Sequence, residues 1–283
     1  MEVIESVHAM QEKAEALRLK GYTMGFVPTM GFLHEGHLEL MRVAKRHCDI
    51  LVVSIFVNPT QFGPDEDFEK YPRDMEGDME KAEGVGTDIL FVPGADDMYP
   101  QGFQSGVKVS DLTKKLCGIS RPVHFDGVTT VVTKLFNAVK PDMAVFGQKD
   151  FQQLTVISRM VKDLNMDIRI IGVPTVRESD GLAMSSRNKY LTREERESAL
   201  SLNASLEMAE AMFKKGERSA EKIREAVASF IKGHPFTEID YVSLCDPDTL
   251  EEMDLLGEKN LLALAVKVGA TRLIDNRVIS GSA

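Results

Sequence analysis

The alternation of short apolar runs with helical patterns constrains the fold of this chain more than any other feature. The runs are nearly continuous in Val, Ile, Leu and Phe, as expected of strands that are buried on both faces. They occupy residues 23–27, 50–57, 88–92, 143–146 and 168–173. Helical patterns occupy residues 6–20, 37–47, 73–83, 128–139 and 151–164. This alternation predicts an α/β fold with a doubly wound, Rossmann-like parallel sheet of about five strands.

The pattern changes near residues 174–190. Thr192 and Glu195 have the spacing of a capping box that opens a long helix, and a second helix is expected from Ser219. Strand-like runs follow at residues 239–244, 261–268 and 273–274. We therefore expect a Rossmann-like domain over residues 1–175 and a smaller C-terminal α+β domain over residues 176–283, which covers the ligand site.

Composition limits the partners and the compartment. The formal net charge of −10 disfavours nucleic acid and anionic membranes as partners. No run approaches the ~18 apolar residues of a membrane span, and the first 21 residues lack the basic and apolar parts of a secretory signal. The cysteines, Cys48, Cys117 and Cys245, are scattered, which favours a reducing compartment and packing roles. These features predict a cytoplasmic protein with neither membrane nor nucleic-acid contacts.

The segment PTMGFLHEGH follows the first predicted strand and leads into a helix. A helix N-terminus directs backbone N–H groups and the positive end of its dipole at a bound anion. Gly31 and Gly36 would let a phosphate approach the backbone, and His34 and His37 could both donate to it from one helix face. Zinc is the competing interpretation. It is disfavoured because the spacing is one residue short of H-E-x-x-H and no third ligand is evident.

Polar residues also follow the other predicted strands. Asn58 and Gln61 come after the second strand, residues 147–150 after the fourth, and residues 174–178, which lead to residues 184–187, after the fifth. Ligands bind beyond the carboxyl ends of strands in open α/β sheets, so we expect these segments to converge on one cleft. The amides suit hydroxyl or carboxylate groups of a small substrate, or else they cap a turn.

Two cations and several acids complete the candidate set. Lys149 at a helix start and Arg187 after a Ser-Ser pair suit a triphosphate. Asp74, Asp78 and Asp150 could help to hold Mg²⁺ on phosphates. The chain has neither G-x-x-x-x-G-K-[ST] nor G-x-G-x-x-G, so P-loop and dinucleotide sites are disfavoured.

Four segments occur in order along the chain, namely PTMGFLHEGH, VNPTQFGPDEDFEKYPRD, FGQKDFQQ and PTVRESDGLAMSSRNKYL. Together they resemble the motifs of the pantothenate synthetase (pantoate–β-alanine ligase) family. H-x-G-H alone is shared with nucleotidyltransferases and class I aminoacyl-tRNA synthetases, but the four together are specific. The resemblance covers essentially the whole chain. It implies a fold of the nucleotidyltransferase type and an ATP-dependent ligase that converts pantoate to pantoyl adenylate and then joins it to β-alanine.

The resemblance also implies residue roles, a homodimer and Mg²⁺. His37 would be the proton-donating catalytic residue, with His34, Lys149 and Arg187 beside the reacting phosphates. The ATP site would comprise Met30, Gly31, Phe32, Leu33, His34, Glu35, Gly36, His37, Gly147, Gln148, Lys149, Asp150, Val176, Met184, Ser185, Ser186 and Arg187. Substrate contacts would come from Gln61 and Gln153, with Arg121, His124 and Asn58 as further candidates, and Asp78 would bind the metal. Phe151 departs from the tyrosine of many members.

Two other functions remain open at this point. A nucleotidyltransferase that releases a stable nucleotide ester would share H-x-G-H and the sheet, but would not explain the amides of NPTQ together with Gln152 and Gln153. A non-enzymatic nucleotide sensor would bind ATP without turnover. A tRNA synthetase is disfavoured because the chain is short and acidic and has no evident basic RNA-binding module.

Overall fold

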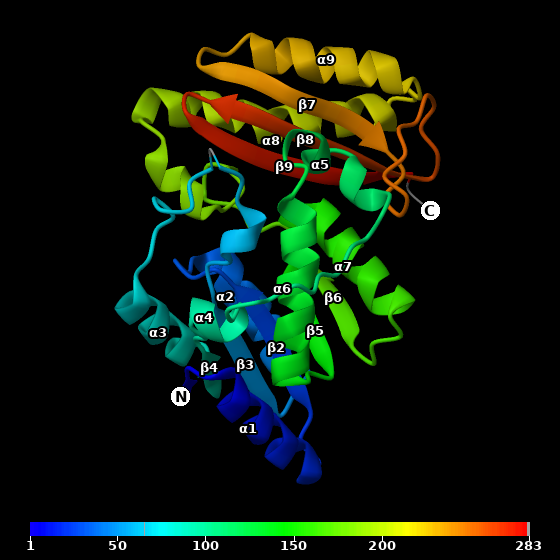
Figure 1. The fold of residues 1–283 in the computed structure, drawn as a ribbon. Coiled ribbons are helices and arrows are strands. Elements are labelled where there is room, and N and C mark those ends of the chain that lie inside the picture. The colour runs from blue at the N-terminus through cyan, green and yellow to red at the C-terminus, as the bar shows by residue number, and fades with distance from the viewer. Residues whose placement is uncertain (65, 282–283) are drawn as a thin grey trace. The chain divides into compact units, whose positions relative to one another are not determined.

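A computed structural model describes residues 1–64 and 66–281. Internal contacts divide the chain into two units (Figure 1). The N-terminal unit comprises Met1–Ser110, Arg121–Gln148 and Val156–Pro174, and the C-terminal unit comprises Asp111–Ser120, Lys149–Thr155 and Thr175–Ala283. Two short segments that precede the expected boundary therefore belong to the C-terminal unit, and no periodicity in the sequence indicates this.

A six-stranded parallel sheet forms the centre of the N-terminal unit, in the order β1-β4-β3-β2-β5-β6. Its strands are β1 (Glu2–Ile4), β2 (Met24–Thr29), β3 (Ile50–Ile55), β4 (Ile89–Phe91), β5 (Met143–Gly147) and β6 (Arg169–Val173). The five strands expected from the apolar runs are present. The sixth, β1, has only three residues and pairs with β4 at the edge of the sheet, so it is too short to produce a sequence pattern.

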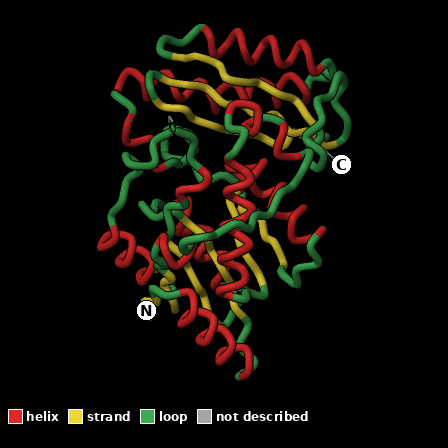
Figure 2. The backbone as a smooth tube through the Cα atoms, in the orientation of Figure 1, coloured by secondary structure: helices red, strands yellow, loops and turns green. Residues whose placement is uncertain are grey.

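Helices cover both faces of this sheet (Figure 2). They are α1 (Val7–Leu19), α2 (Glu35–Lys45), α3 (Met75–Gly84), α4 (Ala95–Met98), α6 (His124–Val139) and α7 (Phe151–Asp163), the last of which begins in the C-terminal unit. On one face, Met41 of α2 and Ala82 of α3 pack with strand residues such as Val53. On the other face, the ring of Phe136 from α6 contacts Phe26, with centroids 6.3 Å apart. The doubly wound sheet predicted from the sequence is confirmed.

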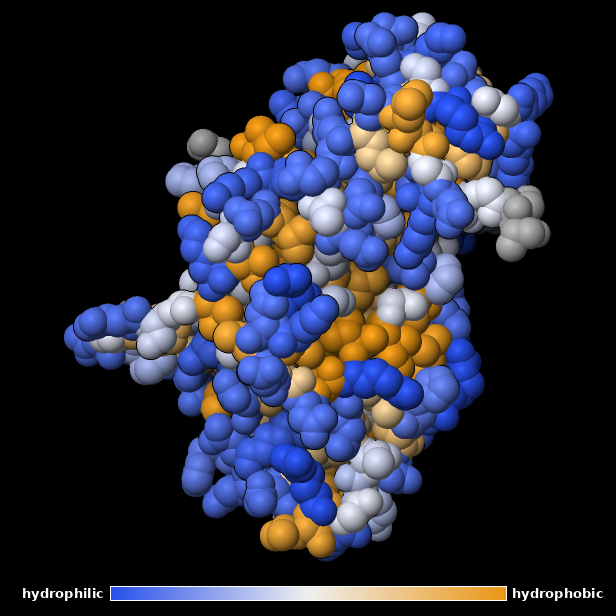
Figure 3. Space-filling model, turned by 90° about the vertical axis from the view of Figure 1, so that its right-hand side faces the viewer, coloured by the Kyte–Doolittle hydropathy of each residue, from blue (hydrophilic) through white to orange (hydrophobic). Residues whose placement is uncertain are grey.

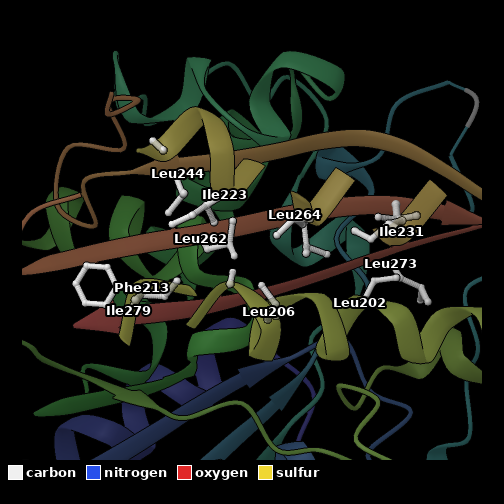
Figure 4. Packing of buried hydrophobic residues seen from close by; sticks show 14 of the residues in the cluster. Leu202, Leu206, Phe213, Ile223, Ile231, Leu244, Leu262, Leu264, Leu273 and Ile279 are labelled. Carbon is white, nitrogen blue, oxygen red and sulfur yellow. The ribbon is translucent and has the colours of Figure 1, made fainter. Parts of the chain in front are cut away.

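The C-terminal unit is an antiparallel sheet of β7 (Thr237–Cys245), β8 (Lys259–Val268) and β9 (Thr271–Ser280), with α8 (Arg193–Lys214) and α9 (Ala220–Lys232) packed against it. Leucine and isoleucine side chains of the helices and strands point toward one another in its core (Figure 4). The predicted capping box is present, since Thr192 Oγ1 accepts the N–H of Glu195 and Glu195 Oε2 accepts the N–H of Thr192. The predicted α+β character is thus confirmed.

Short helical turns complete the structure, namely η1 (Pro59–Gln61), η2 (Leu112–Lys114), α5 (Cys117–Ser120), η3 (Gln148–Asp150) and η4 (Ser186–Tyr190). Within residues 1–64 and 66–281, no helix is both long and apolar enough to cross a bilayer. The face drawn in Figure 3 carries a broad area of hydrophobic residues near its middle, surrounded by hydrophilic ones. Cys117 and Cys245 are buried, and burial raises the pKa of the Cys245 thiol to about 12, which favours a packing role.

The core of the C-terminal unit generates a stability prediction. Leu206 on α8 is fully buried, so Leu206→Ala should lower the free energy of unfolding by about 2–5 kcal/mol through lost apolar burial and a residual cavity. Leu255→Ala is the matched control, because Leu255 is 68% exposed and its truncation should change stability by less than about 0.5 kcal/mol. Urea unfolding followed by circular dichroism measures both, and equal effects would contradict the assigned core.

Candidate functional site

The carboxyl ends of neighbouring strands place three of the predicted segments, those that begin after β2, β3 and β5, at the same end of the N-terminal sheet. β2 and β3 end level with each other, since Thr29 pairs with Ile55, and β5 is the other neighbour of β2. Met30, Asn58 and Gly147 each lie at or just beyond the end of one of these strands. Parallel strands direct these ends the same way, as the sequence predicted.

The turn between β2 and α2 is held by a buried carboxylate. Gly31 has φ +80° and Phe32 has φ 51°, so two consecutive residues are left-handed. Asp78 on α3 is 1% exposed; its Oδ2 accepts the N–H of Phe32 at 2.7 Å and its Oδ1 accepts the N–H of Leu33 at 2.6 Å. A Cβ on Gly31 would lie 2.9 Å from both Asp78 Oδ2 and a methyl group of Ile55. Only glycine fits there, and Asp78 fixes the turn.

These contacts bear on the magnesium role predicted for Asp78. Burial raises the pKa of the Asp78 carboxyl group, although the two backbone N–H groups oppose the shift. Both oxygens already accept hydrogen bonds that hold the turn. Among the residues the structure describes, no group of three or more His, Cys, Asp or Glu side chains could hold a metal ion. Magnesium ligation by Asp78 stays a prediction, and its contacts favour an anchoring role.

The two histidines lie at the N-terminus of α2, which begins at Glu35, two residues earlier than predicted. The N–H of His34 donates to Nδ1 of His37 at 3.3 Å. In the neutral His37 ring the proton therefore sits on Nε2, which makes that atom the donor. The two rings lie 4.0 Å apart, centroid to centroid, at an angle of 35°. The pair thus offers a hydrogen-bond donor next to the helix dipole.

Glu35, also predicted to border ATP, is exposed and forms an ion pair with Arg42, which lies about two turns further along α2. The hydrogen bond from Arg42 lowers the pKa of the Glu35 carboxyl group. The carboxylate is therefore held along the helix surface.

The NPTQ loop is linked to the β2–α2 turn by side-chain contacts. Asn58 is 1% exposed, and its Nδ2 donates to Gln61 Oε1 and to the carbonyl of Gly127, both at 3.2 Å. Gln61 Nε2 lies 3.2 Å from Met30 Sδ. A Cβ on Gly127 would lie 2.5 Å from the Thr60 carbonyl oxygen, so this glycine lets α6 approach the loop. The structure therefore brings Met30, Asn58 and Gln61 together.

Arg121 and His124 contact the same loop through its backbone. His124 Nδ1 lies 3.0 Å from the Gln61 carbonyl oxygen, and Arg121 Nη2 donates to that oxygen at 3.4 Å. Arg121 Nε also donates to Glu66 Oε1 at 2.7 Å in an ion pair. The two residues thus hold the backbone of Gln61, and their predicted contact with substrate stays a prediction.

The predicted segment at residues 147–150 is divided between the units, with Gly147 and Gln148 in the N-terminal one. In the C-terminal unit, Lys149 Nζ lies 3.7 Å from Asp150 Oδ2, and the Lys149 carbonyl accepts from Asn276 Nδ2 at 2.8 Å. Gln153 lies half-buried in the first turn of α7. β9 thus fixes the backbone at the lysine.

Backbone pairing shapes the other predicted nucleotide segment of the C-terminal unit. The N–H of Met184 donates to the carbonyl of Val176 at 3.0 Å, and Ser185 Oγ accepts the N–H of Arg187 at 3.2 Å. Ser186 is buried at the start of η4. Asn188 Nδ2 donates to Glu178 Oε1 at 2.7 Å, and this hydrogen bond links the two ends of the segment 178–188.

Several supporting residues were missed by sequence reasoning. Tyr99 contacts Asn58, and Asp275 holds Arg177 through two hydrogen bonds of 2.7 and 2.9 Å. These partners lie 41 and 98 residues apart along the chain, so no local pattern indicated them. Gln152, considered with Gln153 as a possible substrate amide, instead accepts the N–H of Cys117 and donates to the backbone.

Comparisons with known proteins agree along the whole chain. The sequence profile of the family described as Pantoate-beta-alanine ligase matches residues 2–278. A pantothenate synthetase of Syntrophus aciditrophicus is 56% identical over 98% of this chain and 97% of its own. The crystal structure of pantothenate synthetase from Thermus thermophilus has a TM-score of 0.94 and 41% identity, covering 99% of this chain and 100% of that one.

A third relative was solved with ligands. It is the pantoate–β-alanine ligase of Francisella tularensis complexed with beta-gamma ATP and β-alanine, with a TM-score of 0.81 and 32% identity over 100% of this chain and 99% of that one. The family profile, the sequence relative and the solved structure each match nearly the whole chain. The chain therefore belongs to the pantoate–β-alanine ligase family.

Proposed function

We propose that the chain forms pantothenate in two steps, in which pantoate first attacks the α-phosphorus of ATP and β-alanine then displaces AMP. Membership of the ligase family over residues 2–278 is the observation that carries this assignment. The Francisella relative, complexed with beta-gamma ATP and β-alanine, supports ATP and β-alanine as two of the substrates. Pantoyl adenylate is the intermediate that joins the two steps.

The first step needs donors around a phosphorus centre that gains charge, and no enzyme nucleophile, because the carboxylate attacks. The Nε2–H of His37 and the N-terminus of α2 supply such donors in this proposal. His34 holds the His37 ring in place, because its backbone N–H donates to Nδ1 of that ring and the two rings are in contact. Lys149 and Arg187 add positive charge to the phosphates as pyrophosphate departs.

The remaining roles follow the motifs. Gln61 and Gln153 hold pantoate, with Arg121, His124 and Asn58 around the Gln61 loop. The ATP contacts are those of residues 30–37, 147–150, 176 and 184–187. Mg²⁺ enters with the phosphates of ATP. A homodimer and a cytoplasmic location complete the proposal, which rests for these points on the family resemblance and the composition.

The nucleotidyltransferase alternative is not favoured. The relatives described above, which match this chain end to end, are ligases. A stable nucleotide ester would also give no role to a second acceptor substrate such as β-alanine.

The order of the two steps has a direct test. With pantoate and Mg²⁺ present and β-alanine absent, labelled pyrophosphate should exchange into ATP, because adenylation is reversible until the amine arrives. Omitting pantoate is the control and should abolish the exchange. A strict requirement for β-alanine would instead indicate a concerted reaction.

His37→Ala should slow adenylation by roughly 10²–10³-fold, the usual effect of losing one preorganised donor to a developing charge. Formation of the amide from supplied pantoyl adenylate should be slowed less, since pyrophosphate has already departed. Single-turnover kinetics separate the two half-reactions. An equal loss of rate in both half-reactions, in a folded variant that binds ATP, would contradict the proposed action of His37 on the departing phosphates.

Asp78→Asn distinguishes an anchor from a magnesium ligand. The introduced NH₂ group would face the N–H of Phe32 or Leu33, so the turn should loosen and adenylation should slow by roughly 10–100-fold, the cost of leaving a buried donor unpaired. The Mg²⁺ concentration at half-maximal rate should stay as in the wild type. Rescue of the variant by excess Mg²⁺ would contradict the anchoring role and support ligation.

A further inference from the structure

A continuous set of hydrogen bonds runs behind Gln61 in the N-terminal unit. The hydroxyl of Tyr99, just after α4, donates to Asn58 Oδ1 at 2.7 Å. Asn58 Nδ2 donates in turn to Gln61 Oε1 at 3.2 Å. Gln61 Nε2 then lies next to Met30, beyond the end of β2. The side chain of Tyr99 is thus connected, through the NPTQ loop residue Asn58, in one line that ends at the predicted acid-binding amide of Gln61.

Backbone groups fix the orientation of the Asn58 amide. On the oxygen side, the N–H of Thr60 donates to Asn58 Oδ1 at 3.4 Å, and the Thr60 hydroxyl donates to it at 3.0 Å. On the nitrogen side stands the carbonyl of Gly127, which can only accept. A reversed amide would set its NH₂ group against the N–H of Thr60 and its oxygen against the carbonyl oxygen of Gly127. Asn58 therefore must present its NH₂ group to Gln61.

The orientation of Asn58 determines that of Gln61. Since Asn58 presents a donor, Gln61 must turn its oxygen inward, and its NH₂ group is left on the side of Met30. A thioether sulfur is only a weak acceptor, so an anionic or hydroxyl oxygen of a bound acid is a better partner for that NH₂ group. Gln61 thereby acts as a donor toward the substrate.

Tyr99 favours one direction of donation along this line, from its hydroxyl to Asn58 and from Asn58 to Gln61. Its hydroxyl is the nearest donor to Asn58 Oδ1, and it also lies 3.2 Å from the Thr60 hydroxyl. Burial raises the pKa of the Tyr99 phenol, which favours the protonated form that can donate. Asn58 itself is 1% exposed and its amide is engaged at both ends, which leaves it poorly suited to contact substrate directly.

We propose that Asn58 and Tyr99 are positioning residues that lock the Gln61 amide with its N–H groups toward the acid substrate, and so make the site selective for an oxygen acceptor. This inference rests on the proposed function for the identity of the acid, pantoate. It assigns Asn58 a task behind Gln61 in place of the substrate contact predicted from the sequence, and it gives Tyr99 a role that no motif indicated.

Pantoate binding, measured by calorimetry without ATP, tests the proposal independently of turnover. Tyr99→Phe removes one oxygen atom and should weaken pantoate binding about 5-fold, the usual effect of one hydrogen bond. Asn58→Asp replaces the donor with an acceptor, so Gln61 must reverse, and binding should weaken by more than about 30-fold. ATP affinity should stay within about twofold in both variants, since the line ends at the acid. Tyr22→Phe and Asn165→Asp, at exposed positions, are the matched controls.

A double-mutant cycle shows whether Tyr99 acts through Gln61. In the Gln61→Ala background there is no amide to orient, so adding Tyr99→Phe should change the pantoate affinity by less than about twofold. A full, additive loss in that background would overturn the proposal, as would a parallel fall in ATP affinity, which indicates general disruption. If Asn58→Asp fails to fold, the Tyr99 cycle alone decides.

The proposed function has a separate readout. Wild-type protein that binds pantoate but forms no AMP from ATP, pantoate and β-alanine would overturn the ligase assignment. The double-mutant cycle on pantoate affinity would still test the positioning roles of Asn58 and Tyr99. Wild-type turnover without the predicted pattern among the variants would overturn the positioning roles alone.

Discussion

The hydrogen bonds between the Asp78 carboxylate and the N–H groups of Phe32 and Leu33 hold the turn on which the proposed chemistry depends. A left-handed residue other than glycine costs roughly 1–2 kcal/mol, as at Phe32. Each hydrogen bond to a charged group contributes on the order of 1.5–3 kcal/mol, so the pair offsets that strain. Without this anchor the chain would leave β2 in another direction, and His37 would lose its place at the start of α2.

The same arrangement recurs at the neighbouring strand end. There a buried amide, Asn58, replaces the carboxylate, and it orients Gln61 as Asp78 orients the turn. In both places a side chain that a motif search assigns to ligand binding is already engaged with the protein. In the proposed function, direct contacts with ATP and pantoate are made by the Nε2–H of His37 and the Nε2–H groups of Gln61, which their neighbours hold in one orientation.

Long helices and strands with a clear hydrophobic period were predictable. A strand that is buried on both faces has a continuous run of apolar residues in the sequence, and a helix that packs on one side has apolar residues at three- and four-residue spacing. The strand β1 was not predictable, since three residues carry no period. At the site, the sequence indicated which segments lie at strand ends but not which side chains face ligand. Asp78 and Tyr99 reach partners 46 and 41 residues away, and such contacts depend on tertiary packing that no local spacing reports.

Amide hydrogen exchange at Phe32 and Leu33 tests the central claim most directly. If Asp78 holds the turn before any substrate binds, both amides should exchange more than about a hundredfold slower than in an unstructured peptide, and Asp78→Asn should remove that protection while β2 stays protected. Rapid exchange of both amides in the ligand-free wild-type protein would contradict the claim that the site is preorganised by this carboxylate.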